Sequence, residues 1–391
     1  MNQLVKTEES LLYFNSANLS ICPPTILEAT ERYRREFEKN PTQGLKNAWK
    51  QLWQVQTSLA EFFGARPNDL ILRTNVTEVL NTFILGYPLQ PKDEILIGEL
   101  EYGAIGNICQ FRAQRDNLNL RVLKIPQSQA ALVSMTEDSL VELICSQFSP
   151  QTRVLVISHI IASLGLKIPI EKLGKTTRKL GIALIIDGAY APGAIPINFE
   201  CLDEIDFYGC SLYKWMLGPK GTGFGWVHPI HQRSLIPLQA GWTTFESAGS
   251  FSQFGGGSRF QEKFQLSGCR DFAPFYAIQD LLEFWESWPT EKIQEHIFKM
   301  NRDFQKILVE AFNVQPLVTA DPHLQGPMTV FRWPQKLQNF GSTLADKILN
   351  ELNIQMHCTQ LSTGWHGILS PHIQNSEEEI HAAKLRFKKL F

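Results

Sequence analysis

Apolar residues follow two different spacings along this chain, and the two spacings alternate. Short unbroken apolar runs such as IALII are typical of strands that are buried on both faces. Between these runs, apolar residues recur at helical spacing, as in the series Leu45, Ala48, Leu52, Val55 and Leu59. Strands are predicted at 69–72, 94–97, 120–125, 153–158, 182–186, 206–210 and 223–227, and helices at 25–39, 44–63, 135–146 and 170–180. This alternation predicts an α/β fold with a mainly parallel, doubly wound sheet.

The last third of the chain has a different pattern. Its predicted elements are two helices from Pro274 onward, strands at 328–333 and 354–357, and a helix at 377–390. A chain of 391 residues is long enough for one large and one small domain. We predict a large domain at 25–273 and a smaller α+β domain formed by 1–24 together with 274–391.

Composition excludes several classes of function. The net charge is −2 with acidic and basic residues interspersed, so neither a nucleic acid nor a membrane surface is predicted as a partner. The first residues lack the features of a signal peptide, and no apolar run is long enough to span a bilayer, so we expect a soluble cytoplasmic protein. Seven cysteines without a C-x-x-C pair form neither a disulfide framework nor a zinc ribbon. His228 and His231 are interpreted as surface loop residues, and no metal site is predicted.

Two opposite charges stand where predicted strands end. Asp187 follows the strand at 182–186, and Lys214 lies shortly after the strand at 206–210. In open α/β sheets, ligands bind beyond the carboxyl ends of the strands. Burying a charge is costly, so either the two residues form a structural ion pair or the lysine is a desolvated amine that forms a Schiff base. Residue types alone favour the ion pair.

The sequence segments around these two residues resemble those of a known family. The segments DGAYAPG and DFYGCSLYKWMLGPKGTGF are similar to the pyridoxal phosphate (PLP)-binding core of the class V aminotransferase superfamily. The resemblance is strongest to its isopenicillin N epimerase-like branch, which is related to cysteine desulfurases and C–S lyases. It implies the PLP-dependent transferase fold of type I, with a seven-stranded-type sheet in the large domain. It also implies that Asp187 meets the pyridinium nitrogen and that Lys214 carries the cofactor as a Schiff base.

The helix start at RTNVTEVL has two readings. Asn75 and Thr77 are residue types that cap helices, and a helix N-terminus also binds phosphate. The resemblance implies further cofactor contacts: Val76 and Thr77 to the phosphate through backbone N–H groups, Tyr102 over the ring, Ala189 on the opposite face, Tyr190 near the phenolic oxygen, and Ser211 and Tyr213 to the phosphate. Tyr102 has a structural alternative as a half-buried tyrosine at the end of the sheet.

The chain departs from the family pattern at three positions. Ala162 replaces a polar residue near the cofactor oxygen. Cys269 stands where a threonine usually reaches the phosphate of the partner subunit's cofactor, with Arg270 beside it, and this segment implies a homodimer with shared active sites. Ile368 occupies the position of the arginine that usually binds the substrate carboxylate. The candidates to replace that arginine are Arg259, Arg270 and Arg332.

The resemblance implies a PLP-dependent enzyme that acts at Cα of an amino acid or an amine-bearing metabolite through an external aldimine, as an epimerase or aminotransferase does. Two alternatives stay open. One is a C–S lyase or cysteine desulfurase type of β-elimination, although Cys358 is interpreted as a buried strand residue rather than a nucleophile. The other is a catalytically silent PLP-binding protein. The Gly-, Ser- and Phe-rich stretch 242–265 is predicted to be a mobile loop over or beside the active site.

Overall fold

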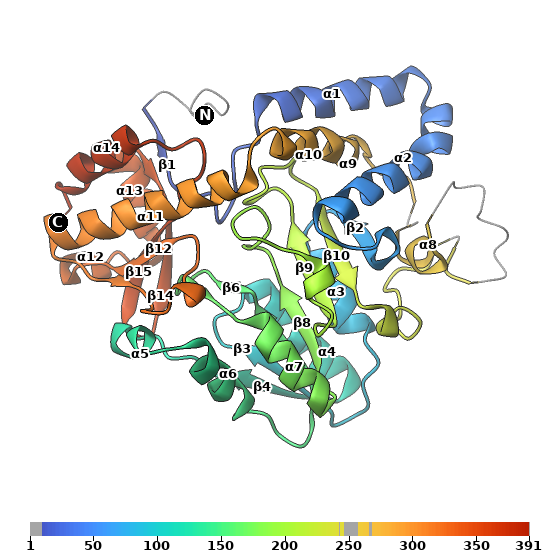
Figure 1. Ribbon diagram of the computed structural model, residues 1–391, viewed down its shortest axis with the longest axis horizontal. Coiled ribbons are helices and arrows are strands. Elements are labelled where there is room, and N and C mark those ends of the chain that lie inside the picture. Colours follow the sequence, from blue (N-terminus) through green and yellow to red (C-terminus); the bar gives the residue numbers. More distant parts are fainter. Residues whose placement is uncertain (1–9, 242, 246–256, 266–267, 391) are drawn as a thin grey trace.

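The computed structural model describes residues 10–241, 243–245, 257–265 and 268–390. Its centre is a seven-stranded sheet, which confirms the predicted fold class. The strands run in the order β2 (Leu70–Arg73), β10 (Gly223–Val227), β9 (Phe207–Ser211), β8 (Ala183–Asp187), β5 (Thr152–Ser158), β3 (Glu94–Gly98) and β4 (Asn119–Leu123). Only β10 is antiparallel to its neighbours in this sheet, so the remaining strands point the same way (Figure 1).

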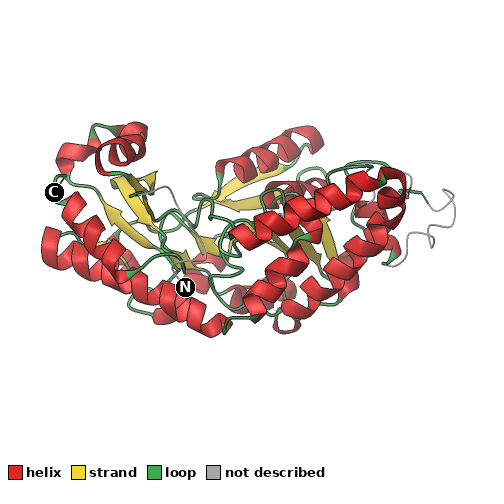
Figure 2. Ribbon diagram, turned by 90° about the horizontal axis from the view of Figure 1, so that it is seen from above, coloured by secondary structure: helices red, strands yellow, loops and turns green. Residues whose placement is uncertain are grey.

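Helices cover both faces of the sheet (Figure 2). Val154 and Val156 of β5 belong to a core shared with α3 and α4, whereas Leu155 and Ile157 belong to a core shared with α2, α6 and α7. A strand that is buried on both faces needs apolar residues at every position, which explains the unbroken apolar runs of the sequence. The helices of this part are α1 (Pro24–Lys39), α2 (Pro41–Phe62), α3 (Val76–Gly86), α4 (Gly103–Asp116), α5 (Gln129–Val133), α6 (Glu137–Cys145), α7 (Ile170–Leu180), α8 (Arg259–Gln265), α9 (Ala273–Tyr276) and α10 (Ile278–Glu286).

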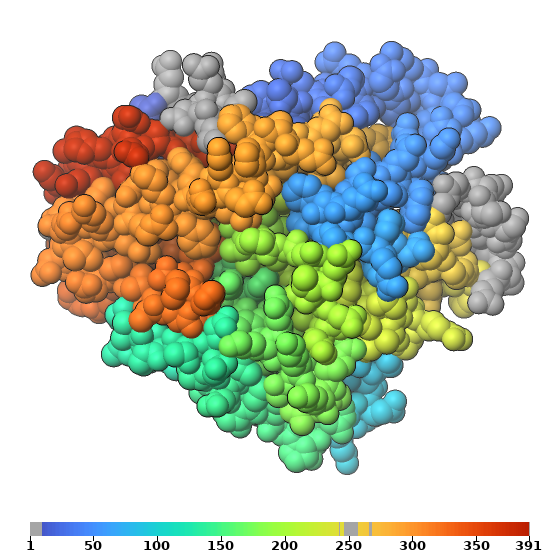
Figure 3. All heavy atoms as spheres, viewed as in Figure 1, coloured from blue at the N-terminus to red at the C-terminus, as the bar shows by residue number. Residues whose placement is uncertain are grey.

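A second sheet lies in the C-terminal part, where the strand order is β11-β12-β15-β14. Its elements are α11 (Thr290–Phe312), β11 (Pro316–Leu317), β12 (Thr329–Arg332), α12 (Gln335–Gln338), α13 (Leu344–Leu352), β13 (Ile354–Gln355), β14 (His357–Leu361), β15 (Gly364–Leu369) and α14 (Glu377–Phe387). The remaining strands are β1 (Leu12–Tyr13), β6 (Ile160–Ile161) and β7 (Leu166–Lys167). In the space-filling view the orange and red residues of this part gather at one side of the molecule (Figure 3).

The N-terminal segment is anchored in this C-terminal part. Strand β1 pairs in parallel with β13, and the fully buried Phe14 makes an edge contact with Phe304 of α11 at 4.8 Å between ring centroids. Helices α9 and α10, in contrast, lie against α1 and α2. The proposed division into domains at 25–273 stays a prediction.

Three local predictions were wrong. The end of the stretch 242–265 is helix α8, because Phe260 and Phe264 lie one helical turn apart and are both buried against the core shared with α3. Residues 242 and 246–256 of that stretch lie outside the described residues. Between Phe272 and β11 the chain forms three helices rather than two, and strand β15 was missed because Gly364 and Gly367 interrupt its apolar pattern.

The anchoring of the N-terminal segment can be tested by truncating its buried ring. Phe14→Ala should lower the free energy of unfolding by about 3–5 kcal/mol, because it leaves a cavity against Phe304. Leu19→Ala, at a position that is 45% exposed, should change it by less than about 0.5 kcal/mol. Urea denaturation of both variants measures the difference, and equal effects would contradict the anchoring.

Candidate active site

The carboxyl ends of three parallel strands meet at one edge of the central sheet. Asp187 is the last residue of β8, and it stands opposite Ser158, the last residue of β5. Ser211 ends the neighbouring strand β9. Since ligands of doubly wound sheets bind at this edge, the fold places the residues that the sequence singled out where a ligand is expected.

Asp187 is a buried carboxylate with a fixed orientation. Its side chain is 2% exposed, and its Oδ1 accepts a hydrogen bond of 2.9 Å from the backbone N–H of Ala189. Burial raises the pKa of Asp187, and the nearby charge of Lys214 opposes that rise. Only glycine fits at position 188, between Asp187 and Ala189, because a Cβ there would lie 2.1 Å from the Tyr208 ring.

Lys214 lies in a tight turn after β9. The backbone N–H of Leu217 donates to the carbonyl of Lys214 at 3.0 Å, and that of Gly218 donates to the carbonyl of Leu212 at 2.7 Å. The ammonium nitrogen of Lys214 lies 4.1 Å from the centroid of the Tyr190 ring. Burial lowers the pKa of Lys214 to about 8, and Asp187 opposes this shift.

The direction of this shift bears on the ion-pair alternative. A lysine in a structural ion pair has its charged form stabilised, so its pKa rises. Here desolvation outweighs the attraction of Asp187, and no ion pair between Lys214 and Asp187 is found among the described residues. The lowered pKa and the missing contact favour a desolvated amine over a structural ion pair.

The start of α3 lies against the end of β9. Ser211 Oγ accepts a hydrogen bond of 3.0 Å from the backbone N–H of Val76, and the Asn75 side chain caps the helix by accepting from the N–H of Glu78 at 3.0 Å. Thr77 is the second residue of this helix. Tyr213 is held nearby, because its carbonyl accepts from the N–H of Ser20 at 3.2 Å. A helix N-terminus beside a serine hydroxyl is a suitable site for a phosphate group.

The other predicted residues are less uniformly placed. Ala189 is buried beside Asp187. Tyr102, the residue before α4, is 59% exposed, and it raises the pKa of Tyr190 in addition to the larger effects of burial and Asp187. Cys269 is exposed, and its thiol makes no hydrogen bond among the described residues.

Sequence reasoning missed Glu101. Its carboxyl oxygens accept hydrogen bonds from the N–H of Ser158 at 2.9 Å and from Ser158 Oγ at 2.5 Å, directly beside Asp187 in the sheet. Burial, together with the smaller effect of the negative charge of Asp187, raises the pKa of Glu101 to about 8. The only signal in the sequence was a carboxylate immediately before Tyr102 at the end of a strand.

His159 is a core histidine rather than a reacting group. Its Nδ1 lies 3.0 Å from the hydroxyl of Tyr208, and burial lowers its pKa to about 3. Ala162 is partly buried against the apolar core, which agrees with the loss of a polar contact at that position.

The three arginines considered as replacements for the carboxylate-binding arginine have different surroundings in the structure. Ile368 is buried in the apolar core on β15, so no cation occupies the family's arginine position. Arg332 Nε donates to the carbonyl of Thr363 at 2.6 Å, and Arg259 lies 3.5 Å from Glu262. In Arg270, by contrast, the buried Nε and Nη2 have no hydrogen-bond partner within the described part of the chain.

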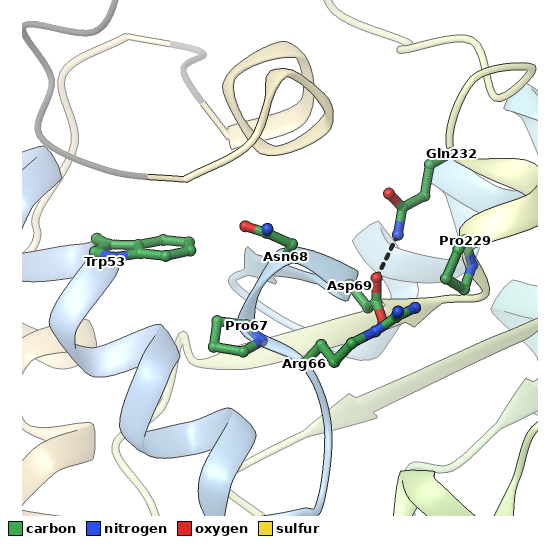
Figure 4. Close-up of a pocket in the computed structure, with 7 residues that line it drawn as sticks. All are labelled: Trp53, Arg66, Pro67, Asn68, Asp69, Pro229 and Gln232. Carbon is green, nitrogen blue, oxygen red and sulfur yellow. Dashed lines mark hydrogen bonds and ion pairs between the residues drawn. The ribbon is translucent and has the colours of Figure 1, made fainter.

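A cavity at the opposite edge of the sheet is a poor candidate for the site. It has a volume of about 310 Å³ and is lined by Trp53, Arg66, Pro67, Asn68, Asp69, Pro229 and Gln232 (Figure 4). Its polar groups are paired with each other, since Asp69 accepts from Gln232 at 2.7 Å and from Arg66 at 2.9 Å. Asp69 precedes β2 and Pro229 follows β10, so the cavity lies far along the strands from Asp187 and Lys214.

Within residues 10–390, apart from the gaps named above, no cluster of three or more His, Cys, Asp or Glu side chains is arranged to hold a metal ion. Over the same residues, no helix has both the length and the apolar character needed to cross a membrane.

Comparison with known proteins decides the family. Residues 12–371 match the model of the family described as aminotransferase class-V. The chain belongs to this family. The donor set fits the family's cofactor, since a buried carboxylate, a desolvated lysine and a helix N-terminus with a serine stand at one edge. The protein is therefore a PLP-dependent enzyme.

Individual relatives span several reactions. An isopenicillin N epimerase from Amycolatopsis lactamdurans is 27% identical over 347 residues, which cover 87% of this chain and 85% of the relative. A probable cysteine desulfurase from Methanothermobacter thermautotrophicus is 22% identical, covering 75% of this chain and 71% of the relative. The solved structure of the cystine C–S lyase C-DES with cysteine persulfide has a TM-score of 0.85, 21% identity and 98% coverage of both chains. That likeness confirms the fold.

The buried carboxyl of Glu101 leads to a prediction about pH. Its pKa is raised from an ordinary 4.5 to about 8, so between these values the folded state binds more protons than the unfolded state. Glu101 therefore stabilises the fold at low pH, and this contribution is lost as the pH rises through 8. In Glu101→Gln the amide can accept from the N–H of Ser158 and donate to Ser158 Oγ without titrating.

The measurement is the urea midpoint of the cofactor-free protein at several values between pH 5 and 8.5. The wild type should lose stability across this window, and Glu101→Gln should lose clearly less. Parallel curves for the two proteins would show that Glu101 does not titrate as inferred.

Proposed function

We propose that this enzyme transfers a proton at Cα of an amino acid or an amine-bearing metabolite, as an epimerase or an aminotransferase does. The observation that carries the proposal is the placement of the Lys214 amine, 4.1 Å from the centroid of the Tyr190 ring, at the same edge of the sheet as the buried carboxylate of Asp187. Burial also lowers the pKa of Lys214 to about 8. An amine with a pKa near neutral pH is suited both to nucleophilic attack and to accepting a proton.

Each residue has a proposed role. PLP, when bound, supplies an electron sink for negative charge that develops at Cα. Asp187 keeps a proton on the ring nitrogen, and its hydrogen bond with the N–H of Ala189 fixes the direction of the carboxylate. Lys214 holds the cofactor and moves the Cα proton. The proposed contacts to the phosphate are those of Val76, Thr77, Ser211 and Tyr213, and the proposed contacts to the ring are those of Tyr102, Ala189 and Tyr190.

An epimerase-like reaction is supported by the relatives with that name, which match over most of this chain. The substrate carboxylate has no arginine at position 368, because that position lies in the apolar core. The substrate is therefore held in a different way, or it presents a different group at this place.

A C–S lyase or desulfurase reaction is the second candidate, and it is supported by the probable cysteine desulfurases among the relatives. The desulfurase form needs a reactive thiolate. Cys358 is buried in β14, where burial raises the pKa of its thiol to about 12. Of the two forms, a lyase without a cysteine nucleophile is the better supported. A silent PLP-binding protein is a third candidate, motivated by Ala162, Cys269 and Ile368.

Proton transfer can be tested by solvent exchange. The wild-type enzyme with PLP should exchange the Cα proton of one amino acid in a panel for deuterium in D₂O, as seen by NMR. Lys214→Ala should lower the exchange rate by about 10²–10⁴-fold, because the base is lost. The control variant is Lys220→Met. Lys220 lies in the same loop, and its ammonium donates to the carbonyl of Ser20. This variant should keep most of the exchange rate.

The products separate the candidates. Inversion of the substrate indicates an epimerase, and a keto acid with an aminated cofactor indicates an aminotransferase. Release of sulfur or persulfide indicates a lyase. Exchange that survives in Lys214→Ala at the wild-type rate would contradict the proposed role of Lys214, and no exchange with any substrate would favour the silent protein.

We also propose a cytoplasmic homodimer with shared active sites, which binds neither nucleic acid nor membranes. The exposure of Tyr102 and Cys269 supports a second copy that covers this side of the site. Sedimentation equilibrium should give twice the mass of 44.5 kDa at micromolar concentration. A monomer that still performs the reaction at full rate would contradict shared sites.

A further inference from the structure

The lysine turn, residues 214–218 between β9 and β10, has a strained backbone. Leu217 in this turn has a φ of 64°, a left-handed conformation that is unfavourable for a residue with a Cβ. A backbone of this kind persists only where the surrounding structure holds it, and it is common at functional sites. The contacts that hold the lysine turn therefore bear on the position of the Lys214 amine.

Side chains from later parts of the chain hold two carbonyl groups of the lysine turn. Nε2 of His372 lies 2.8 Å from the carbonyl oxygen of Trp215. The indole N–H of Trp285 donates to the carbonyl of Met216, also at 2.8 Å. His372 follows β15 in the C-terminal part, and Trp285 belongs to α10. All four residues are fully buried, so both contacts are shielded from water, where a missing hydrogen-bond partner is costly.

The surroundings of His372 fix its tautomer. Its Nδ1 accepts a hydrogen bond of 2.7 Å from the backbone N–H of Ile373, so the ring proton lies on Nε2. Because a carbonyl oxygen can only accept, Nε2–H is the donor toward Trp215. Burial lowers the pKa of His372 to about 4, against the opposing effect of the hydrogen bond to Trp215. Near neutral pH the imidazole is therefore an uncharged, oriented donor.

The backbone of His372 is tied to the N-terminal segment. The N–H of His372 donates to Oδ1 of Asn375, and the N–H of Asn375 donates to the carbonyl of His372, both at 2.9 Å. Nδ2 of Asn375 then donates to the carbonyl of Tyr13 and to Oε2 of Glu379, both at 3.0 Å. The imidazole therefore has a fixed position relative to β1 and to the start of α14.

The segment that follows Asp187 lies against the same carbonyl of Trp215. Gly193 of this segment has a φ of 89°, and a Cβ at this position would lie 2.4 Å from the Trp215 carbonyl oxygen. The carbonyl that His372 holds thus joins the lysine turn to the segment after Asp187.

We propose that His372 is a positioning residue, which holds the Lys214 amine at the edge of the sheet through the carbonyl of Trp215. Without this donor the strained backbone at Leu217 relaxes, and the amine loses its orientation toward the aldehyde of PLP. The inference rests on the proposed role of Lys214 as the amine that holds the cofactor. It adds a residue of the C-terminal part to the site.

The test separates bond formation at Lys214 from binding of the cofactor. Bond formation is the rate at which saturating PLP becomes attached to Lys214, trapped with borohydride and mapped by mass spectrometry. Binding alone is measured with pyridoxine phosphate, which lacks the aldehyde that reacts with an amine. His372→Leu should slow bond formation by about tenfold or more, but change the dissociation constant of pyridoxine phosphate by less than about twofold, because positioning affects the reaction rather than the pocket.

Two further variants attribute the effect to the hydrogen bond. In His372→Gln the amide nitrogen can donate to the Trp215 carbonyl from a similar place, so most of the rate should return. The matched control is His366→Leu. It removes another buried histidine of the C-terminal part, whose Nδ1 lies 2.8 Å from the carbonyl of Gly364, and it should leave the rate at Lys214 unchanged.

His372→Asn replaces His372→Leu where the latter fails to fold. Its amide is one methylene shorter than that of His372→Gln and does not reach the Trp215 carbonyl, so bond formation should stay slow. The two amides therefore differ in reach and not in chemistry.

Three results would overturn the proposal. They are a wild-type rate in folded His372→Leu or His372→Asn, an equal loss of bond formation and of pyridoxine phosphate binding, and a rate in His372→Gln no higher than in His372→Asn. The first excludes any role of the imidazole in bond formation, and the second shows a merely structural role. A wild type that attaches PLP elsewhere than on Lys214 would contradict the proposed function itself, and this inference with it.

Discussion

The site depends on a buried carboxylate, Asp187, and a half-buried amine, Lys214, which lie at the same edge of the sheet with no direct ion pair between them among the described residues. Burial raises the pKa of Asp187 and lowers that of Lys214, so the charged form of each residue is disfavoured relative to its charged form in water. Such a pair is a poor stabilising element, because the cost of desolvation is not repaid by close contact. It is a good arrangement for holding a cofactor that supplies the missing partner of each group.

The surrounding fold keeps these two side chains in place. The end of β8 is fixed by β5 on one side and β9 on the other, and the turn of Lys214 is closed by two backbone hydrogen bonds. The hydrogen bond from Val76 to Ser211 then ties α3 to the same edge. The N-terminal segment contributes from a distance, because Ser20 donates to the carbonyl of Tyr213 while Phe14 is buried against α11. The site therefore joins elements from both parts of the chain.

The sequence predicted the central sheet well and its surroundings less well, for physical reasons. Strands β5 and β8 are buried on both faces, so their apolar runs are unbroken and easy to recognise. Strand β15 is interrupted by Gly364 and Gly367, and helix α8 contains only a Phe260–Phe264 pair beside a glycine run, so neither has a clear period. Glu101 could not be found, because its role depends on contact with Ser158, which is distant in sequence. The hydrogen bond from His372 to the Trp215 carbonyl likewise joins residues that are far apart in the sequence.

The most direct test of this account is to find which lysine reacts with the cofactor. The protein is loaded with PLP, reduced with borohydride, digested and mapped by mass spectrometry over a range of pH. The account predicts one pyridoxyl adduct on Lys214, formed with a rate that rises through a pKa near 8, because burial lowers the pKa of that amine. An adduct spread over several exposed lysines, or a Lys214 that stays unmodified, would contradict the central claim.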